Sequence, residues 1–289
     1  MKLRSPLFAP GDSERKAAKA IASDADCVIL DLEDSVAAPA KDAAREMTAA
    51  IVRANGKASS RGRDLIVRVN PRGTPWYLLD LAAIVPAAPQ ALLLPKCTSP
   101  EELVALDHHL EALETAWGLP IGGIKVIALP TETAASVFQL GRYAGAPRLI
   151  AICFGAEDIS ADLGVSPRKP DGSYPDAIAW TRGATLAAAG AAGILALDTP
   201  YPDPRDPAGL LRETQAAVAD GFAGKLLIHP DQIAVVNQAF TPDAERIAWA
   251  IKVRDAFAAN PNAGVLSMDG KMLDRPHLRL AERILAMAG

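Results

Sequence analysis

The sequence predicts an α/β fold, a closed (β/α)8 barrel of the TIM type that carries a C-terminal helical appendage. Eight short runs rich in Val, Ile and Leu recur along the chain, and each is continuous rather than alternating, as in strands buried on both faces of a parallel sheet. Each pair of runs is separated by enough residues for a helix and two turns, and no Pro/Gly/Ser-rich linker divides the chain into halves. An open, doubly wound sheet is the alternative architecture.

The eight predicted strands lie at similar intervals along the chain. They are, in order, Pro6 to Pro10, Cys27 to Leu32, Leu65 to Asn70, Ala91 to Pro95, Lys125 to Pro130, Leu149 to Phe154, Gly193 to Asp198 and Lys225 to Pro230. The segments between them carry helix-start signals. Ser99 is a capping residue before Pro100, and Glu102 follows three residues after the cap. Asp206–Pro207 and Thr241–Pro242 are predicted to start helices in the same way.

The residues after the eighth strand exceed what a barrel needs. We therefore expect a barrel domain at 1–230 and a helical extension or lid at 231–289. Trp249, Val253 and Phe257 stand four apart on one apolar row of a helix, and His277 to Met287 is typical of a second short helix. Such an extension can cover its own barrel or complete the site of a neighbouring subunit.

Composition excludes several classes of protein. Of 289 residues, 50% are hydrophobic and 22% are charged, which indicates a globular chain. Thirty basic and 34 acidic residues give a net charge of −4 without any Lys/Arg run, so neither nucleic acid nor an anionic membrane is an expected partner. The three cysteines have no zinc-site spacing and are expected to be buried and reduced. Without a signal peptide or an 18-residue apolar stretch, the chain is predicted to be cytoplasmic.

Polar residues gather where the predicted strands end. Active sites of (β/α)8 barrels lie at the carboxyl ends of the strands, and ionisable groups beside buried strands cost free energy unless they are paired or used. The pattern therefore predicts a site. The residues concerned are Asp31, Glu33 and Asp34, then Arg68 and Asn70, Lys96, Glu132, Glu157 and Asp158, Asp198 and His229.

Glu132 and Asp158 follow adjacent strands, whose axes lie about 4.8 Å apart, so both carboxylates can reach one cation. Two oxygen ligands suit Mg²⁺, which keeps several waters and accepts substrate oxygens. Exposed loop acids, or salt bridges to Arg68 or Lys96, are the alternative interpretation. Arg68 interrupts an apolar strand and is expected to face either the neighbouring acids or a substrate carboxylate.

A further anion site is predicted near the N-terminus. The loop at 10–13 precedes a helix and offers free backbone N–H groups, with Arg15 and Lys19 close behind. His229 precedes a proline, and a histidine in that position is more often a structural hydrogen-bonding group than a catalyst.

Several strings resemble one family. The chain is similar to the citrate lyase β-subunit-like family, which includes malyl-CoA and citramalyl-CoA lyases, and the match runs from Arg4 to Leu285. The strings that carry it are, in order, LFAPGDSERKAAKA, VILDLEDSVA, VRVNPRGTPW, LLLPK, FGAEDISADLG, LDTPYPD, GKLLIHPDQI and DGKMLDRP. The resemblance implies a TIM barrel that uses Mg²⁺, or Mn²⁺ in its place, to make or break a carbon–carbon bond beside a CoA thioester.

The resemblance also implies roles for individual residues. It places metal ligation on Glu132 and Asp158, and substrate binding on Arg68 and, through the metal site, on Glu132. One local departure is Thr131, which stands where many relatives have Ile; this bears on the substrate pocket rather than on the metal.

For the remaining roles the resemblance points to both ends of the chain. An aspartate of the C-terminal segment, here Asp274, is implied as the general base, donated by a neighbouring subunit of a homo-oligomer such as a trimer; Asp269 is the nearby alternative. Arg15 and Lys19 match the region that contacts CoA phosphates.

The expected activity is a Mg²⁺-dependent lyase that cleaves or forms a 3-hydroxyacyl-CoA such as citramalyl-CoA or malyl-CoA, with acetyl-CoA and a 2-oxo acid as the other partners. Three alternatives stay open: a malyl-CoA thioesterase, a citrate lyase β subunit that acts on an acyl-carrier-protein thioester, and a catalytically silent barrel that binds CoA.

Overall fold

Eight parallel strands pair in sequence order in the computed structural model, which describes residues 1–56 and 64–288. The sheet closes because Phe8 N–H donates to Leu227 O (2.8 Å) and Leu227 N–H donates to Pro6 O (2.8 Å). The predicted barrel is therefore confirmed. Its strands are β1 (Pro6–Pro10), β2 (Cys27–Asp31), β3 (Leu65–Arg68), β4 (Ala91–Leu94), β5 (Lys125–Ala128), β6 (Leu149–Cys153), β7 (Leu195–Asp198) and β8 (Gly224–Lys225).

The last strand is shorter than predicted. Beyond Lys225 the chain makes single backbone bonds to both neighbours instead of a continuous ladder: Leu226 N–H donates to Asp198 O (3.0 Å), and Leu227 forms an isolated bridge to Leu7. The residues after Lys225 thus complete the barrel without regular strand geometry. An apolar run in the sequence does not show at which residue the hydrogen-bonded ladder ends.

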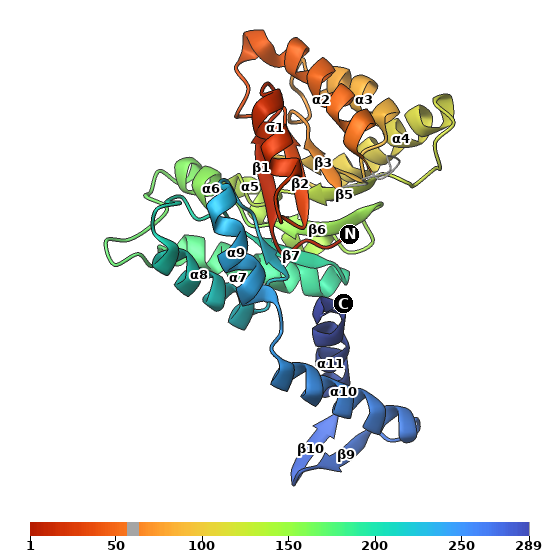
Figure 1. The fold of residues 1–289 in the computed structure, drawn as a ribbon, viewed down its shortest axis with the longest axis vertical. Helices are drawn as coiled ribbons and strands as arrows, with labels where there is room; N and C mark the ends of the chain where they lie inside the picture. The colour runs from red at the N-terminus through yellow and green to blue at the C-terminus, as the bar shows by residue number, and fades with distance from the viewer. Residues whose placement is uncertain (57–63, 289) are drawn as a thin grey trace. The chain divides into compact units, whose positions relative to one another are not determined.

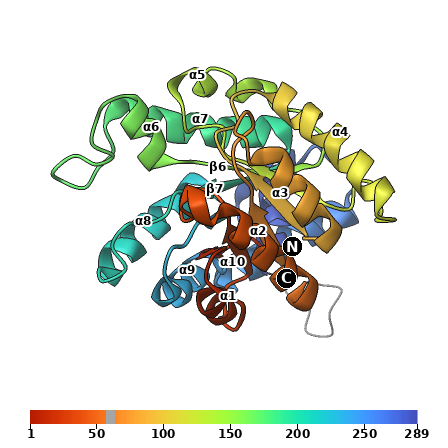
Figure 2. The ribbon, with the colours of Figure 1, turned by 90° about the horizontal axis from the view of Figure 1, so that it is seen from above.

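Helices surround the strands, as the view in Figure 2 shows for α1 to α4, α7 and α8. They are α1 (Glu14–Ile21), α2 (Lys41–Asn55), α3 (Tyr77–Ile84), α4 (Pro100–Ala116), α5 (Ala134–Val137), α6 (Ala156–Asp162), α7 (Asp176–Ala192), α8 (Pro207–Asp220) and α9 (Ile233–Phe240), with short 3-10 turns η1 (Ala38–Ala40), η2 (Val85–Ala87), η3 (Leu140–Arg142) and η4 (Pro230–Gln232).

The helix-start signals were right for two helices and wrong for one. Asp206 caps α8 by accepting from Gly209 N–H (2.8 Å). Ser99 is the cap position of α4, but its side chain makes no capping hydrogen bond, and Glu102 accepts from Thr98 N–H (3.2 Å) instead. The predicted start at Thr241–Pro242 is wrong, because α10 begins at Ala244 and Asp243 accepts from Arg246 N–H (2.7 Å). A carboxylate that follows the proline therefore provides the cap.

Side chains from both faces of the barrel strands are buried. Ile29, Ile66 and Leu93 belong to one interior cluster, while Val28 and Leu30 on the other face of β2 are equally inaccessible. Burial on both faces explains why the strand sequences are continuous apolar runs. Cys27, Cys97 and Cys153 are buried thiols that form no disulfide with one another, as predicted.

The chain divides into two compact units, at 1–236 and 237–289; the boundary expected from the sequence lay at 230. The second unit comprises α10 (Ala244–Ala259), β9 (Val265–Met268), β10 (Lys271–Asp274) and α11 (Arg275–Ala288) (Figure 1). Its core includes Val253 and Phe257 of the predicted apolar row, together with Leu273 and Ile284. None of the helices in the described residues is long and apolar enough to cross a membrane.

The antiparallel hairpin β9–β10 was not predicted. Its two-residue turn is Asp269–Gly270, with φ of +51° and +75°. An Asp-Gly pair between extended segments is a hairpin signal because both residues tolerate positive φ. The flanking strands are only four residues long and Leu273 is their one buried side chain, so their hydrophobic pattern was too weak to reveal them.

Candidate active site

The first part of the site is an ion-pair group at the ends of β2 and β3. Arg68 donates from Nε to Asp31 Oδ1 (2.6 Å) and from Nη2 to Asp31 Oδ2 (2.8 Å), while its Nη1 lies 2.9 Å from Glu33 Oε2. The Phe8 ring lies against the guanidinium, 4.9 Å from its Cζ. Burial acts to raise the pKa of Asp31, but the hydrogen bonds and charge of Arg68 outweigh it and hold that pKa below its ordinary value. Arg68 is thus fixed by acids, and its Nη1 edge faces Glu33.

Lys96 connects this group to the next strands. Its Nζ lies 2.5 Å from Glu33 Oε1, 3.6 Å from Asp34 and 3.7 Å from Asp158, and its backbone N–H donates to Glu132 Oε2. The residue has φ of +47°, which is uncommon for a side chain of this kind and occurs mainly where the surroundings require it. Here the left-handed backbone lets one residue offer its N–H to one carboxylate and its ammonium to three others.

Glu132 is a buried acid that, unlike the other carboxylates of the described site, forms no ion pair with a cationic side chain. It is 3% exposed, and its Cγ lies close to Gly155, where an added Cβ would be only 3.1 Å away. Burial, followed by the charges of Glu33 and Asp158, raises its pKa to about 8. The negative charges that surround the buried Glu132 side chain favour the binding of a cation beside it.

Asp158 lies in the first turn of α6, with its side chain 36% exposed. The whole site contains more carboxylates than cationic side chains, and this imbalance fits a divalent cation. Its carboxylates are Asp31, Glu33, Asp34, Glu132 and Asp158, and its cations are Arg68 and Lys96. Residues 1–56 and 64–288 contain no cluster of three or more His, Cys, Asp or Glu arranged around a metal position. A site with two protein carboxylates, completed by water and substrate oxygens, is the type that Mg²⁺ uses.

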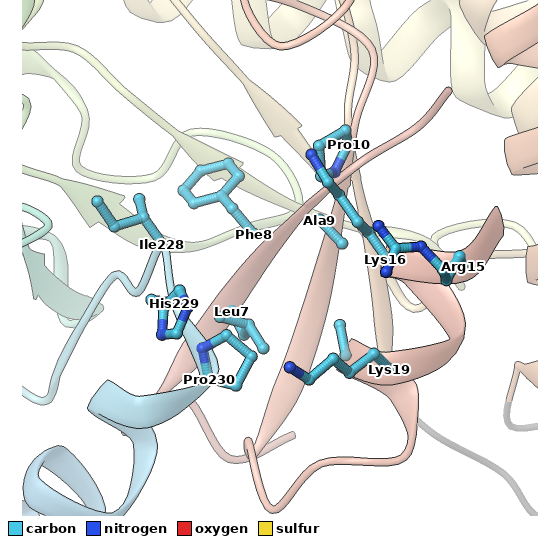
Figure 3. Close-up of a pocket in the computed structure, with 11 residues that line it drawn as sticks. Leu7, Phe8, Ala9, Pro10, Arg15, Lys16, Lys19, Ile228, His229 and Pro230 are labelled. Atoms are coloured by element: carbon cyan, nitrogen blue, oxygen red, sulfur yellow. The ribbon is translucent and has the colours of Figure 1, made fainter. Parts of the chain in front are cut away.

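A cleft of about 370 Å³ lies beside β1, between α1 and the segment that follows β8 (Figure 3). Arg15, Lys16 and Lys19 of α1 line one side, and His229 lies on the other. The three cationic side chains are exposed and form no ion pair within the described chain, so the cleft is suited to an anionic ligand. The Nδ1 of His229 accepts from Asp231 N–H (3.3 Å), as expected of a structural hydrogen bond.

The candidate base lies in the second unit. Asp274 is the last residue of β10, its side chain is 34% exposed, and its Oδ1 lies 2.6 Å from His277 Nδ1. The alternative, Asp269, occupies the hairpin turn with positive φ, which gives that aspartate a structural reason to be present. Asp274 therefore stays the first of the two candidates, as the resemblance implies.

The structure brings together Arg68, Glu132 and Asp158, and separately Arg15 and Lys19. The sequence analysis did not assign roles to Glu33, Lys96 and Lys16. Lys96 directly follows the LLLP run and Lys16 adjoins Arg15, so position relative to the strands was an available signal. No sequence signal shows that Glu33 lies between two cations, because that depends on how three loops pack.

The profile of the HpcH/HpaI aldolase/citrate lyase family matches residues 4–230. This chain belongs to that family. The citrate lyase subunit beta of Leuconostoc mesenteroides subsp. cremoris is 36% identical over 99% of this chain and 93% of its own length. The mitochondrial citramalyl-CoA lyase of Homo sapiens is 33% identical over 99% of this chain and 85% of its own.

Solved structures of family members have the same fold. The protein CitE from Mycobacterium tuberculosis, crystallised with magnesium, acetoacetate and coenzyme A, has a TM-score of 0.77 and 35% identity over 100% of this chain and 98% of its own. The citrate lyase beta subunit of M. tuberculosis complexed with oxaloacetate and magnesium has a TM-score of 0.71 and 37% identity over 83% of this chain. Both the barrel and the C-terminal unit thus have counterparts in a member of the family.

Proposed function

We propose that this protein is a Mg²⁺-dependent lyase that cleaves, or forms, a 3-hydroxyacyl-CoA such as citramalyl-CoA or malyl-CoA, with acetyl-CoA and a 2-oxo acid on the other side of the reaction. The observation that carries the proposal is the buried Glu132, whose raised pKa and proximity to Asp158 leave negative charge in need of a cation. The M. tuberculosis CitE complex with magnesium, acetoacetate and coenzyme A, and the human citramalyl-CoA lyase, support the choice of cofactor and substrate class.

Glu132 and Asp158 would hold the metal, and Mn²⁺ would replace Mg²⁺ with the same oxygen ligands. A bound metal would supply Lewis-acid stabilisation of the substrate alkoxide oxygen, which becomes the keto oxygen of the 2-oxo acid. Glu132 loses its proton when it takes up this role, because only the carboxylate is a ligand. Lys96 holds the Glu132 carboxylate through its backbone N–H and balances the adjoining acids through its ammonium.

Arg68 is positioned to stabilise charge at the reacting carbon atoms. Asp31 binds its Nε and Nη2 and Glu33 pairs with its Nη1, so the guanidinium is held in one orientation. In the cleavage direction a base takes the 3-hydroxyl proton, the bond between the carbinol and α carbons breaks, and its electrons form the thioester enolate. A fixed cation such as Arg68 stabilises the negative charge on the enolate or on the acid carboxylate.

The cleft beside β1 would take the anionic end of CoA. Arg15, Lys16 and Lys19 offer three cations on one helix face, and phosphate groups bind well to cations near a helix N-terminus. We propose that the thioester end of the substrate extends from this cleft to the carboxyl ends of β2 and β3.

Asp274 is our proposed general base. Its carboxylate is partly exposed and paired with His277, which orients it without removing it from solvent. In a homo-oligomer, with a trimer as the expected form, the C-terminal unit would donate Asp274 to the barrel of a neighbouring copy.

Product analysis tests the activity. Purified protein is incubated with Mg²⁺ and a panel of 3-hydroxyacyl-CoAs, and the products are identified by mass spectrometry. We expect acetyl-CoA and a 2-oxo acid. Free CoA with intact hydroxy acid would instead establish a thioesterase. Turnover that requires an acyl-carrier-protein thioester would establish a citrate lyase β subunit, the second candidate, which relatives of that name at 34–36% identity favour.

Asp274→Asn tests the base. The variant should lose about 10²-fold or more in kcat while its Kd for CoA stays unchanged, since only the proton acceptor is removed. Asp269→Asn is the matched control and should keep kcat, although its hairpin turn is altered. Full activity in Asp274→Asn together with a loss in Asp269→Asn would transfer the role to Asp269.

A further inference from the structure

A single buried hydroxyl group connects the two loops that carry Glu132 and Asp158. Thr131 is fully buried directly before Glu132, and its Oγ1 donates to Cys153 O (3.2 Å) and accepts from Gly155 N–H (2.9 Å). Cys153 is the last residue of β6, and Gly155 is the cap position of α6, whose first turn contains Asp158. The hydroxyl therefore spans the whole turn from strand to helix.

In the described residues, no backbone hydrogen bond connects these two loops beyond the last ladder pair. The last β5–β6 pair is Ala128 with Ile152. Beyond it, Leu129 N–H donates to Leu94 O on β4 (2.9 Å), and Phe154 N–H donates to Leu197 O on β7 (2.9 Å). Both N–H groups thus point away from the junction between β5 and β6, and the Thr131 side chain forms the hydrogen bonds across it.

The distance between the loops bears directly on the position of Glu132. A Cβ on Gly155 would lie 3.1 Å from Glu132 Cγ and 3.8 Å from Thr131 Oγ1, so the stem of Glu132 rests on the backbone that Thr131 holds. A shift of Gly155 would move Glu132 and the first turn of α6 relative to each other. The sequence analysis connected Thr131 with the substrate pocket, whereas its hydroxyl is directed between the two loops.

We propose that Thr131 is a positioning residue that fixes the separation of the Glu132 and Asp158 carboxylates and so sets the affinity of the metal site. This inference rests on the proposed function, because it takes those two residues as the metal ligands. Groups that orient ligands from behind change metal affinity by about 10- to 100-fold when they are removed. Loss of the Thr131 hydroxyl leaves the Cys153 carbonyl and the Gly155 N–H without their buried partner, and the loops are then free to separate.

The test measures binding of Mn²⁺ alone to the full chain by electron paramagnetic resonance, without substrate. Thr131→Val keeps the shape and removes the hydroxyl, and we expect its Kd for Mn²⁺ to rise about tenfold. Thr131→Ser keeps the hydroxyl, and its Kd for Mn²⁺ should lie within about twofold of the wild-type value. Thr214→Val is the matched control: Thr214 is also fully buried, but its hydroxyl donates to Leu210 O (2.7 Å) within α8, so the Kd should not change.

Wild-type affinity in Thr131→Val would overturn the inference while leaving the metal site intact. If Thr131→Val does not fold, the Thr131→Ser and Thr131→Ala pair decides, because those two differ only in the hydroxyl; equal Kd values for the pair would overturn it. A wild-type protein that binds no Mn²⁺ would overturn the proposed function together with this inference, so the two failures are distinguishable.

Discussion

Two groups of charged residues around the barrel strands differ in how their charges are balanced. The first, which we call the mouth cluster, consists of Asp31, Glu33, Asp34, Arg68, Lys96, Glu132 and Asp158. The second, the β7–β8 cluster, consists of Arg168, Arg182, Asp198, Glu213, Asp220 and Lys225. The mouth cluster has more acids than cations, whereas the β7–β8 cluster has as many cations as acids.

In the β7–β8 cluster, Asp198 and Glu213 each have two cationic partners, and Asp220 pairs with Arg182. Lys225 Nζ lies 3.0 Å from Asp198 and 2.6 Å from Glu213, Arg182 Nε lies 3.0 Å from Asp198, and Arg168 pairs with Glu213. Burial acts to raise the pKa of Asp198, but the charges of Lys225 and Arg182 outweigh it and the pKa is lowered. In Glu132 the same burial prevails, and the pKa is raised to about 8.

The comparison shows which strand-end charges are structural and which are available for binding. Asp198 and Glu132 look alike in sequence, since each is an acid at or just after the end of an apolar run. A carboxylate whose pKa is lowered is already stabilised by the fold, whereas one whose pKa is raised gains most from an added cation. The distinction would be refuted if a Glu132 variant changed stability without affecting metal binding, or if an Asp198 variant changed metal binding without affecting stability.

Glu132→Gln should have the largest effect on activity. Removal of a metal ligand is expected to lower Mg²⁺-dependent kcat by about 10³-fold or more. Stability should change in the opposite direction. The folded-state pKa of Glu132 is raised, so its stabilising contribution is present below about pH 4.5 and is lost as pH rises to about 8. Gln does not ionise, and without metal the variant should have a higher Tm than the wild type at pH 8 to 9, measured by calorimetry.

The two measurements on Glu132→Gln can fail separately. Unchanged turnover would remove Glu132 from the metal site. A lower Tm at pH 9 would show that the wild-type carboxylate is already stabilised by the fold, which would remove the difference between the two clusters.

Asp198→Asn should show the reverse pattern. It leaves Lys225 and Arg182 facing a neutral amide in a fully buried position, which is expected to cost about 3 kcal/mol of unfolding free energy. The Kd for Mg²⁺ should stay at its wild-type value. Denaturant titration and calorimetric metal binding measure the two quantities. Asp176→Asn is the control: Asp176 also pairs with a lysine, but its side chain is 98% exposed, and the variant should unfold at the wild-type denaturant concentration.

Metal binding to the wild type should release protons. With its pKa raised to about 8, Glu132 is expected to be mostly protonated in the free site below that pH, and the metal must displace that proton. We therefore expect the affinity to rise up to about tenfold per pH unit, with a plateau above pH 8. Calorimetry in two buffers of different ionisation enthalpy counts the protons released at pH 6.5. Asp198→Asn, which alters only the paired cluster, should release the same number, and an absence of release in the wild type would contradict the raised pKa.

Sequence reasoning predicted the barrel well because eight continuous apolar runs reflect burial on both faces of each strand. It placed Arg68, Glu132 and Asp158 correctly at the strand ends, since the order of the strands fixes which ends are neighbours. It could not separate Asp198 from Glu132, because the partners of Asp198 come from α7 and from a lysine at the start of the next apolar run. Pairing of this kind depends on how helices pack onto the barrel and leaves no local pattern.

The smallest effect is expected for a variant in the cleft beside β1. Here the comparison is between an unpaired and a paired lysine instead of between two acids. Lys19 forms no ion pair in the described residues, whereas Lys225 is buried between two carboxylates. Lys19→Ala should raise KM for the CoA thioester about fivefold with unchanged kcat, because an exposed charge contributes about 1 kcal/mol to phosphate binding. Lys169→Ala, which removes an exposed lysine paired with Asp176, should leave both constants unchanged. If added salt weakens substrate binding to the wild type but not to Lys19→Ala, the unpaired cation is the one that contacts the phosphates.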